Sequence, residues 1–313
     1  MTSVAIVGSG LIGRAWGAVF ARSGFEVALY DPAPGATDAA RANIAQSLEE
    51  QQSLGLVDDA TSAVARIRIA TDLADAVRGA AFVQENGPET PEGKKALFAE
   101  LDRLAAPDTI LASSTSFIPC SVFSADLAGR ARCLVGHPVN PPHLVPIVEI
   151  APAPWTDPAV VETARGLYER AGQVPIVLRR EVQGFVLNRL QAALLAEAFR
   201  IVGAGICSPE DVDKTIRDGL GYRWSFMGPF ETIELNAPGG IADYATRYGA
   251  SLDRMTKDIL VEDAFGADTI ATIMSQWPGA QTKERIAELS NWRDQRLAAL
   301  KAHKAKMPGK PDV

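Results

Sequence analysis

The chain has 313 residues, of which 47% are hydrophobic and 22% charged, and its formal net charge is -7. This length and composition allow a sizeable buried core and two domains. The acidic balance argues against a nucleic-acid partner, because neutralising phosphates requires a basic face. No apolar run approaches the roughly 20 residues of a membrane helix, and the N-terminus lacks the basic start of a signal peptide. We therefore expect a cytoplasmic protein without a membrane partner.

The three cysteines are Cys120, Cys133 and Cys207, and none of them belongs to a Cys-x-x-Cys pair. This spacing predicts neither a disulfide framework nor a zinc site, so we expect no bound metal. The lysines between Lys301 and Lys310 are interpreted as a solvated helix end and tail rather than a binding patch.

Short β-branched runs alternate with alanine-rich helical stretches from residue 3 to about residue 180. This alternation predicts a doubly wound α/β fold, in which helices cover both faces of a mainly parallel sheet. The predicted strands are Val4 to Val7, Glu26 to Tyr30, Ile67 to Ala70, Phe82 to Glu85, Thr109 to Ala112, Cys133 to Gly136 and Val174 to Leu178.

The pattern changes after Gly184. Apolar residues from Leu187 to Val202 recur at steps of three and four, which predicts one long helix with an apolar stripe. Ser208-Pro209-Glu210-Asp211 then offers an N-cap, a first-turn proline and early acids, which are typical of another helix start. We predict two domains, residues 1–184 and an all-helical domain of residues 185–313.

The first predicted strand leads directly into Gly8-Ser9-Gly10-Leu11-Ile12-Gly13 and an alanine-rich helix. Glycines at this spacing permit a tight turn, the approach of a pyrophosphate and close packing of helix on strand. The second strand ends at Asp31, where a carboxylate can bind the adenosine ribose. A Rossmann-type domain that prefers NAD to NADP is predicted, because Asp31 would repel a 2′-phosphate and no arginine follows before Arg41.

His137 follows the strand from Cys133 to Gly136, at the sheet edge where open α/β folds bind ligands. A histidine suits the transfer of a hydroxyl proton, and a nearby carboxylate would orient its ring. Glu149 is the candidate partner because it interrupts an apolar strand. Taken alone, however, His137 is also compatible with a structural turn, and Glu149 with an outward position on an edge strand.

Three further segments carry a family resemblance: Gly136-His137-Pro138-Val139-Asn140-Pro141-Pro142, Val148-Glu149, and Gly184-Phe185-Val186-Leu187-Asn188-Arg189. In this order behind a glycine-rich turn, they resemble the 3-hydroxyacyl-CoA dehydrogenase superfamily. The resemblance implies catalytic roles for His137 and its partner Glu149. It also implies that Ser116 and Asn188 hydrogen-bond the substrate oxygen. Asn140, which lies in the same segment as His137, is expected to be a further substrate contact. Cofactor contacts beyond the glycine-rich turn and Asp31 are expected from Glu89, Lys94 and Ser114.

The stretches from Gly219 to Trp224, from Gly228 to Asn236 and around Trp292 look like the lambda-crystallin and L-gulonate 3-dehydrogenase branch of that superfamily. That branch oxidises a free sugar acid at carbon 3 and forms homodimers through its helical domain. Arg223 is the candidate for pairing with the substrate carboxylate; a surface position or an ion pair across a dimer is the alternative.

The residues from Pro32 to Ala65 hold one cation, Arg41, against five acids. Such a stretch disfavours the polyanionic carrier of a CoA thioester, although binding through backbone donors stays possible. L-Carnitine is another candidate substrate, for which Trp224 and Phe226 could contribute to an ammonium pocket. A crystallin-like structural role and an NAD-sensing module are the non-enzymatic alternatives, but both would leave the catalytic positions free to drift.

Overall fold

The computed structural model describes residues 2–259, 264–277 and 282–307. These residues form two compact units, one made of residues 2–186 and the described residues from 288 onward, the other of residues 187–287. Within the described ranges, no helix is both long and apolar enough to span a membrane.

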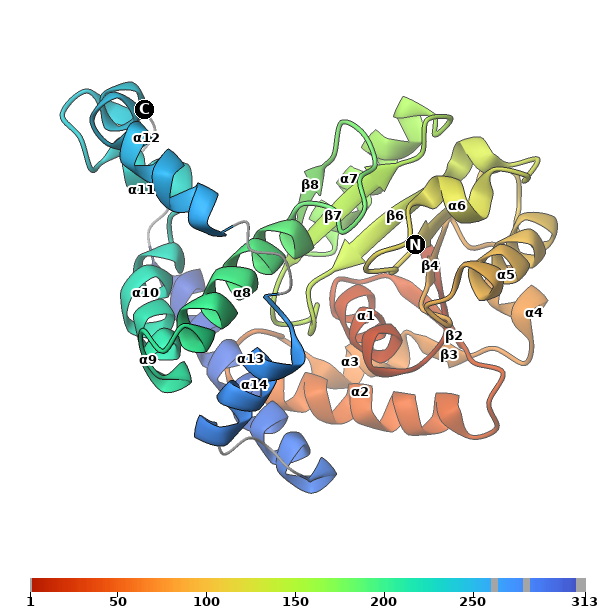
Figure 1. Cartoon of the computed structure of the whole chain (residues 1–313). Helices are drawn as coiled ribbons and strands as arrows, with labels where there is room; N and C mark the ends of the chain where they lie inside the picture. The colour runs from red at the N-terminus through yellow and green to blue at the C-terminus, as the bar shows by residue number, and fades with distance from the viewer. Residues whose placement is uncertain (1, 260–263, 278–281, 308–313) are drawn as a thin grey trace. The chain divides into compact units, whose positions relative to one another are not determined.

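The first unit is built on one eight-stranded sheet with the order β3-β2-β1-β4-β5-β6-β7-β8 (Figure 1). Every neighbouring pair of strands is parallel except β6 and β7, which are antiparallel. This confirms the predicted mainly parallel, doubly wound sheet. The strands are β1 (Ser3–Val7), β2 (Glu26–Tyr30), β3 (Ile67–Ile69), β4 (Phe82–Glu85), β5 (Ile110–Ser113), β6 (Cys133–Pro138), β7 (Ile147–Pro152) and β8 (Val174–Val177).

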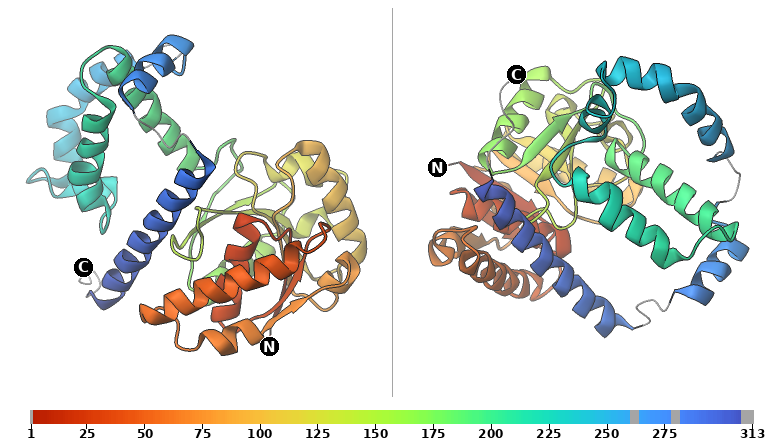
Figure 2. Two further views of the ribbon diagram at one scale, coloured as in Figure 1. Left: turned by 90° about the horizontal axis from the view of Figure 1, so that it is seen from below. Right: turned by 90° about the vertical axis from the view of Figure 1, so that its left-hand side faces the viewer.

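Helices cover both faces of this sheet (Figure 2). Strand β1 shows why: Val4 and Ile6 belong to one buried apolar cluster, whereas Ala5 and Val7 belong to another. Successive side chains of a strand point to opposite faces, so each face has its own core. One cluster is closed by α1 (Leu11–Arg22), α2 (Ala36–Ser53), α3 (Ala60–Ala65) and α7 (Pro158–Arg170), the other by α4 (Leu73–Val77), α5 (Pro91–Leu104) and α6 (Cys120–Ser124).

The reversed strand β7 follows β6 after a loop of residues 139–146. A loop of this length closes an antiparallel pair, because a parallel neighbour would need a crossover of a dozen or more residues. In the resulting register His137 lies directly opposite Glu149. Glu149 is therefore on an interior strand between β6 and β8, and the alternative of an outward position on an edge strand is wrong.

All elements that the structure describes in the second unit are helical, as predicted. They are α8 (Leu187–Gly203), α9 (Pro209–Lys214), the π-helical turn η2 (Thr215–Leu220), α10 (Gly221–Trp224), α11 (Pro229–Glu234), α12 (Gly240–Ile259), α13 (Ala267–Gln276) and the first turn of α14 (Lys283–Lys306). Ser208 is the N-cap of α9 and accepts a hydrogen bond from the backbone N–H of Asp211 at 3.1 Å, which confirms the predicted helix start.

The described part of α14 from residue 288 onward groups with the first unit, unlike the sequence-based division at residue 184. Ala298 is buried, and the Lys301 Nζ donates to the backbone carbonyl of His143 at 2.9 Å. Lys301 is half-buried, so its interpretation as part of a solvated tail is wrong, whereas Lys304 and Lys306 are exposed as expected. Lys310 lies outside the described residues. Ala298 and Lys301 are three residues apart and therefore lie on one face of α14. This face packs within the first unit.

Candidate active site

The glycine-rich turn between β1 and α1 has a distinct requirement at each glycine. Gly8 has φ +89°, and a Cβ there would lie 2.6 Å from the Asn86 carbonyl oxygen. A Cβ on Gly13 would lie 1.8 Å from the Gly8 carbonyl oxygen, so helix α1 packs against the turn only through glycine. Gly10, in contrast, has no protein atom within 4 Å of its Cβ position. This open space at the N-terminus of α1 fits a cofactor pyrophosphate, which helix N–H groups attract.

Asp31 follows β2 and lies against the same turn. Its Oδ2 accepts hydrogen bonds from the Ser9 backbone N–H at 2.7 Å and the Ser9 hydroxyl at 3.0 Å, and its Oδ1 accepts from the Ala33 N–H at 2.9 Å. A carboxylate offers about four acceptor sites, so Asp31 can still accept from a ribose hydroxyl. Leu11 is exposed beside the turn and Ile12 is half-buried. These residues fit the adenosine half of NAD.

His137 and Glu149 form a buried pair at the carboxyl end of β6. The His137 Nδ1 lies 2.8 Å from the Glu149 Oε2, and the two residues are 4% and 0% exposed. Because a carboxylate accepts at Nδ1, the ring is the tautomer that carries its proton there. Nε2 then holds the lone pair, and within the described part of the chain it forms no hydrogen bond. The arrangement fixes the orientation of the ring and is suited to a base that accepts a proton at Nε2.

The segment before α8 completes the surroundings of this pair. The backbone N–H of Val186 donates to the Glu149 Oε1 at 2.8 Å. Phe185 has φ +50°, a strained conformation for a bulky residue. Its buried ring lies 5.3 Å from the His137 ring, centroid to centroid. The Gly184-Phe185-Val186 motif thus holds Glu149 through its backbone and covers His137 with an aromatic ring, a role that the sequence did not indicate.

The segment after β5 carries Ser114 and Ser116. The Ser114 hydroxyl accepts from the Trp16 Nε1 at 3.1 Å and the Gln84 Nε2 at 2.7 Å, and donates to the Asn86 Oδ1 at 2.7 Å. Since β5 neighbours β6, this segment lies beside the strand that carries His137. Ser114 is held by protein groups, and Ser116 follows it toward the exposed end of the segment.

Glu89 and Lys94 belong to a second polar network at the end of β4. The Glu89 Oε1 accepts from the Thr115 hydroxyl at 2.6 Å and the Ser116 N–H at 2.9 Å. The Lys94 Nζ is 1% exposed and lies 3.0 Å from the Glu85 Oε2 and 3.5 Å from the Glu89 Oε2. Glu85, the last residue of β4, is completely buried and was not a sequence candidate.

The remaining candidates are Asn140, Asn188 and Arg223. Asn140 is exposed in the loop after β6. Asn188 is in the first turn of α8, two residues along the chain from Val186. Arg223 in α10 is exposed and forms no ion pair with any other described residue. The structure describes each unit by itself, so the roles of Asn188 and Arg223 toward substrate stay predictions.

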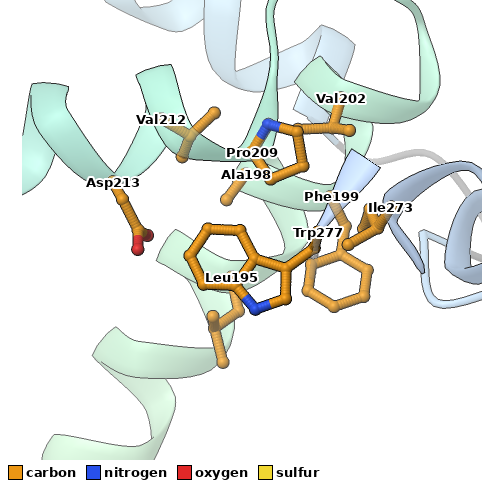
Figure 3. A pocket seen from close by; sticks show the side chains of 9 residues that line it. All are labelled: Leu195, Ala198, Phe199, Val202, Pro209, Val212, Asp213, Ile273 and Trp277. Carbon is orange, nitrogen blue, oxygen red and sulfur yellow. The ribbon is translucent and has the colours of Figure 1, made fainter. Parts of the chain in front are cut away.

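The helical unit contains an apolar cavity of about 190 Å³ (Figure 3). Leu195, Phe199, Val202 and Trp277 contribute to its lining, and Asp213 is its one acidic residue. Neither Trp224 nor Phe226, the aromatic candidates for an ammonium pocket, lines this cavity. Over the described ranges of the chain, no group of His, Cys, Asp or Glu side chains is arranged to hold a metal ion.

Together, the glycine-rich turn, the acid after β2 and the His–Glu pair at the carboxyl end of the sheet define an NAD-dependent dehydrogenase acting on a CH–OH group. Residues 3–182 match the NAD-binding domain of 3-hydroxyacyl-CoA dehydrogenase, and residues 184–275 match the C-terminal domain of that family. The chain belongs to the 3-hydroxyacyl-CoA dehydrogenase family.

Relatives within the family cover nearly the whole chain. A lambda-crystallin homolog of Bos taurus is 42% identical over 306 residues, covering 95% of each chain. An L-carnitine dehydrogenase of a Pseudomonas species is 36% identical over 307 residues, covering 95% of this chain and 92% of its own. The solved structure of an NAD-dependent 5-formyl-3-hydroxy-2-methylpyridine 4-carboxylic acid 5-dehydrogenase is 30% identical, covers 98% of this chain and 100% of its own, and superimposes with a TM-score of 0.85. The lambda-crystallin branch indicated by the sequence is confirmed as a close relative.

Proposed function

We propose that this enzyme oxidises the 3-hydroxyl of a small free 3-hydroxy acid, such as the sugar acid L-gulonate, to the 3-keto acid. The observation that carries this proposal is the buried His137–Glu149 pair, with the Glu149 Oε2 2.8 Å from Nδ1 of the ring. This geometry leaves Nε2 of a neutral imidazole as the proton acceptor that an alcohol oxidation requires.

The proposed steps assign one task to each residue. Nε2 of His137 accepts the hydroxyl proton, and Glu149 stabilises the resulting imidazolium through Nδ1. Bound NAD supplies the acceptor for the hydride that leaves carbon 3. Ser116 and Asn188 hydrogen-bond the substrate oxygen, and Phe185 keeps water from the buried side of the ring. Burial of the pair strengthens its electrostatic interaction because fewer water molecules screen it.

Surface charge supports a free acid over a CoA thioester. The five acids between Pro32 and Ala65 are all exposed, on α2 and the segment that follows it. Asp38, Glu49, Glu50, Asp58 and Asp59 face a single cation, Arg41, so a carrier with several phosphates would meet net repulsion there. Two of the compared relatives are also named for free carboxylic acids.

L-Carnitine is the second candidate substrate because one relative is an L-carnitine dehydrogenase. Its quaternary ammonium needs aromatic or acidic surroundings. Trp224 and Phe226 are 40% and 69% exposed, so both offer ring surface to such a group.

The experiment that separates these substrates is NADH formation measured at saturating NAD with four compounds: L-gulonate, L-carnitine, 3-hydroxybutyrate and 3-hydroxybutyryl-CoA. The proposal expects the highest kcat/KM for L-gulonate and a lower value for the CoA thioester than for the free 3-hydroxybutyrate. A preference for the thioester over both free acids would contradict it.

A homodimer through the helical unit is part of the proposal. Large apolar side chains of that unit are exposed, among them Leu190, Tyr222, Phe226, Phe230 and Leu235, each by more than 60%. Apolar surface of this kind marks an association interface. Light scattering on the purified protein should give twice the 33.3 kDa chain mass, and a monomeric mass at micromolar concentration would contradict the dimer.

A further inference from the structure

The proposed steps of the reaction assign no task to the ion pair of Glu85 and Lys94. Lys94 is 1% exposed and Glu85 is 0% exposed. The ammonium nitrogen donates to both carboxylate oxygens of Glu85, at 3.1 and 3.0 Å. Ser113 donates its hydroxyl proton to the Glu85 Oε2 at 2.6 Å, and the Gly87 N–H donates to Oε1 at 2.5 Å. Each oxygen of the Glu85 carboxylate therefore accepts two hydrogen bonds from protein donors.

Glu89 connects this buried pair to the segment that carries Ser116. Its Oε2 lies 3.5 Å from the Lys94 ammonium nitrogen. Its Oε1 accepts from the Thr115 hydroxyl at 2.6 Å, the Ser116 N–H at 2.9 Å and the Phe117 N–H at 3.3 Å. One end of the Glu89 carboxylate therefore binds the buried cation, and the other end binds the turn after β5.

We propose that Glu85 and Lys94 are positioning residues, which fix Ser116 through Glu89. Lys94 attracts the Glu89 carboxylate toward the protein interior, and Glu85 holds Lys94 in place through both of its oxygens. Strand β5 adds a second link, because Ser113 binds Glu85 and lies three residues before Ser116. The turn is thus linked to one buried carboxylate directly through Ser113 and indirectly through Glu89 and Lys94, and the backbone of Ser116 keeps a fixed position beside β6.

This proposal adds a positioning role to the expectation that Lys94 contacts the cofactor. The ammonium group donates to both oxygens of Glu85, and the Glu89 Oε2 lies 3.5 Å from it. The effect on turnover depends on the proposed role of Ser116 in substrate binding, whereas the effect on the turn itself does not.

Three variants test the arrangement. Glu89→Ala removes the acceptor of the turn at a position where 43% of the side chain is exposed, so the fold should tolerate it. The double variant Glu85→Gln/Lys94→Met removes both buried charges together and leaves neither unpaired. The matched control is Lys95→Met, which changes the exposed neighbour of Lys94 on the same helix.

The direct measurement is hydrogen–deuterium exchange of the peptide spanning residues 113–119. Compared with Lys95→Met, both test variants should exchange about tenfold faster in this peptide. Glu89→Ala removes the charged acceptor of its amides, and the double variant removes the cation that holds this acceptor in place. Exchange in β1 and β2 should be unchanged. Unaltered exchange in the peptide would overturn the proposal, as would faster exchange spread equally over the sheet, which is the result of a merely structural pair.

Kinetics provide the second measurement. At saturating NAD, kcat/KM of the double variant for the hydroxy acid should fall roughly ten- to a hundredfold, as expected when a contact is misplaced. A turnover of the double variant equal to that of the wild type would overturn the positioning role. If the wild type oxidises none of the tested acids, the proposed function fails, and the exchange measurement still decides the present proposal.

Discussion

At the scale of single residues, two buried acids account for most of the candidate site. Glu149 was predicted from its place in an apolar run, and its contact with His137 follows from the antiparallel register of β6 and β7. Glu85 ends β4 directly after Gln84, and the sequence provides no partner for it, since Lys94 meets it only after α5 packs on the sheet. An acid within an apolar run indicates a buried carboxylate, whereas the identity of its partner depends on tertiary packing.

Asp31→Ala should weaken NAD binding and reduce the preference for NAD over NADP. The variant loses both an acceptor for a ribose hydroxyl and a charge that repels a 2′-phosphate. We expect the Kd for NAD to rise about tenfold, the effect of one charged hydrogen bond. Isothermal titration with both cofactors measures this change, and Asp38→Ala, an exposed acid on α2, is the control. Equal shifts of both constants would show that Asp31 only supports Ser9.

Arg223→Met should raise the KM for the acid substrate by one to two powers of ten, roughly 1.5 to 3 kcal/mol for a charged hydrogen bond. The prediction rests on an exposed guanidinium without an ion pair among the described residues. The KM for NAD and the Tm should stay close to the wild-type values. Arg217→Met is the control, because Arg217 is exposed nearby and pairs with Asp218. An unchanged KM for the acid would remove Arg223 from the site.

At the scale of elements, the predicted strands agree with the structure to within a few residues, whereas their directions were harder to obtain. A local apolar pattern carries no information on strand direction. The one reversed pair could have been inferred from the short loop of residues 139–146, since a parallel connection needs a longer crossover. The contact of α14 with that loop could not be inferred, because Lys301 and His143 are far apart in sequence and their polar character is typical of exposed residues.

The same loop should make the protein sensitive to acid. Burial, followed by the nearby Arg22, Lys301, Arg14 and Arg293, lowers the pKa of His143 from 6.5 to about 4. The unfolded chain therefore binds a proton at a higher pH than the folded chain does. The stabilisation is fully present above pH 6.5 and is lost as the pH falls toward 4.

His143→Gln should reduce this loss of stability between pH 6.5 and pH 4 by about 1 to 3 kcal/mol. Urea unfolding at a series of pH values measures the difference, with His303→Gln as the control because His303 is exposed on α14. If His143→Gln and the wild type lose stability in parallel, His143 is protonated in the folded protein and this explanation is wrong.

At the scale of the whole molecule, the sequence motifs describe the first unit better than the second. The glycine-rich turn, Asp31, His137 and Glu149 depend on local geometry and on one sheet, which hydrophobic patterns predict well. The helical unit was predicted as helical, but its exposed apolar surface and its cavity depend on how helices without a sheet pack on each other. In the proposed function substrate choice lies with that unit, so sequence alone indicates the reaction more clearly than the particular acid.

The central claim is that His137 is the base of an NAD-dependent 3-hydroxy acid dehydrogenase. The most direct test is the kcat of NADH formation from L-gulonate for the wild type and for His137→Ala, with NAD binding titrated in parallel. The account predicts that kcat falls by roughly two to four powers of ten, the usual contribution of general base catalysis, while NAD binding is nearly unchanged. A kcat for His137→Ala close to that of the wild type would contradict it.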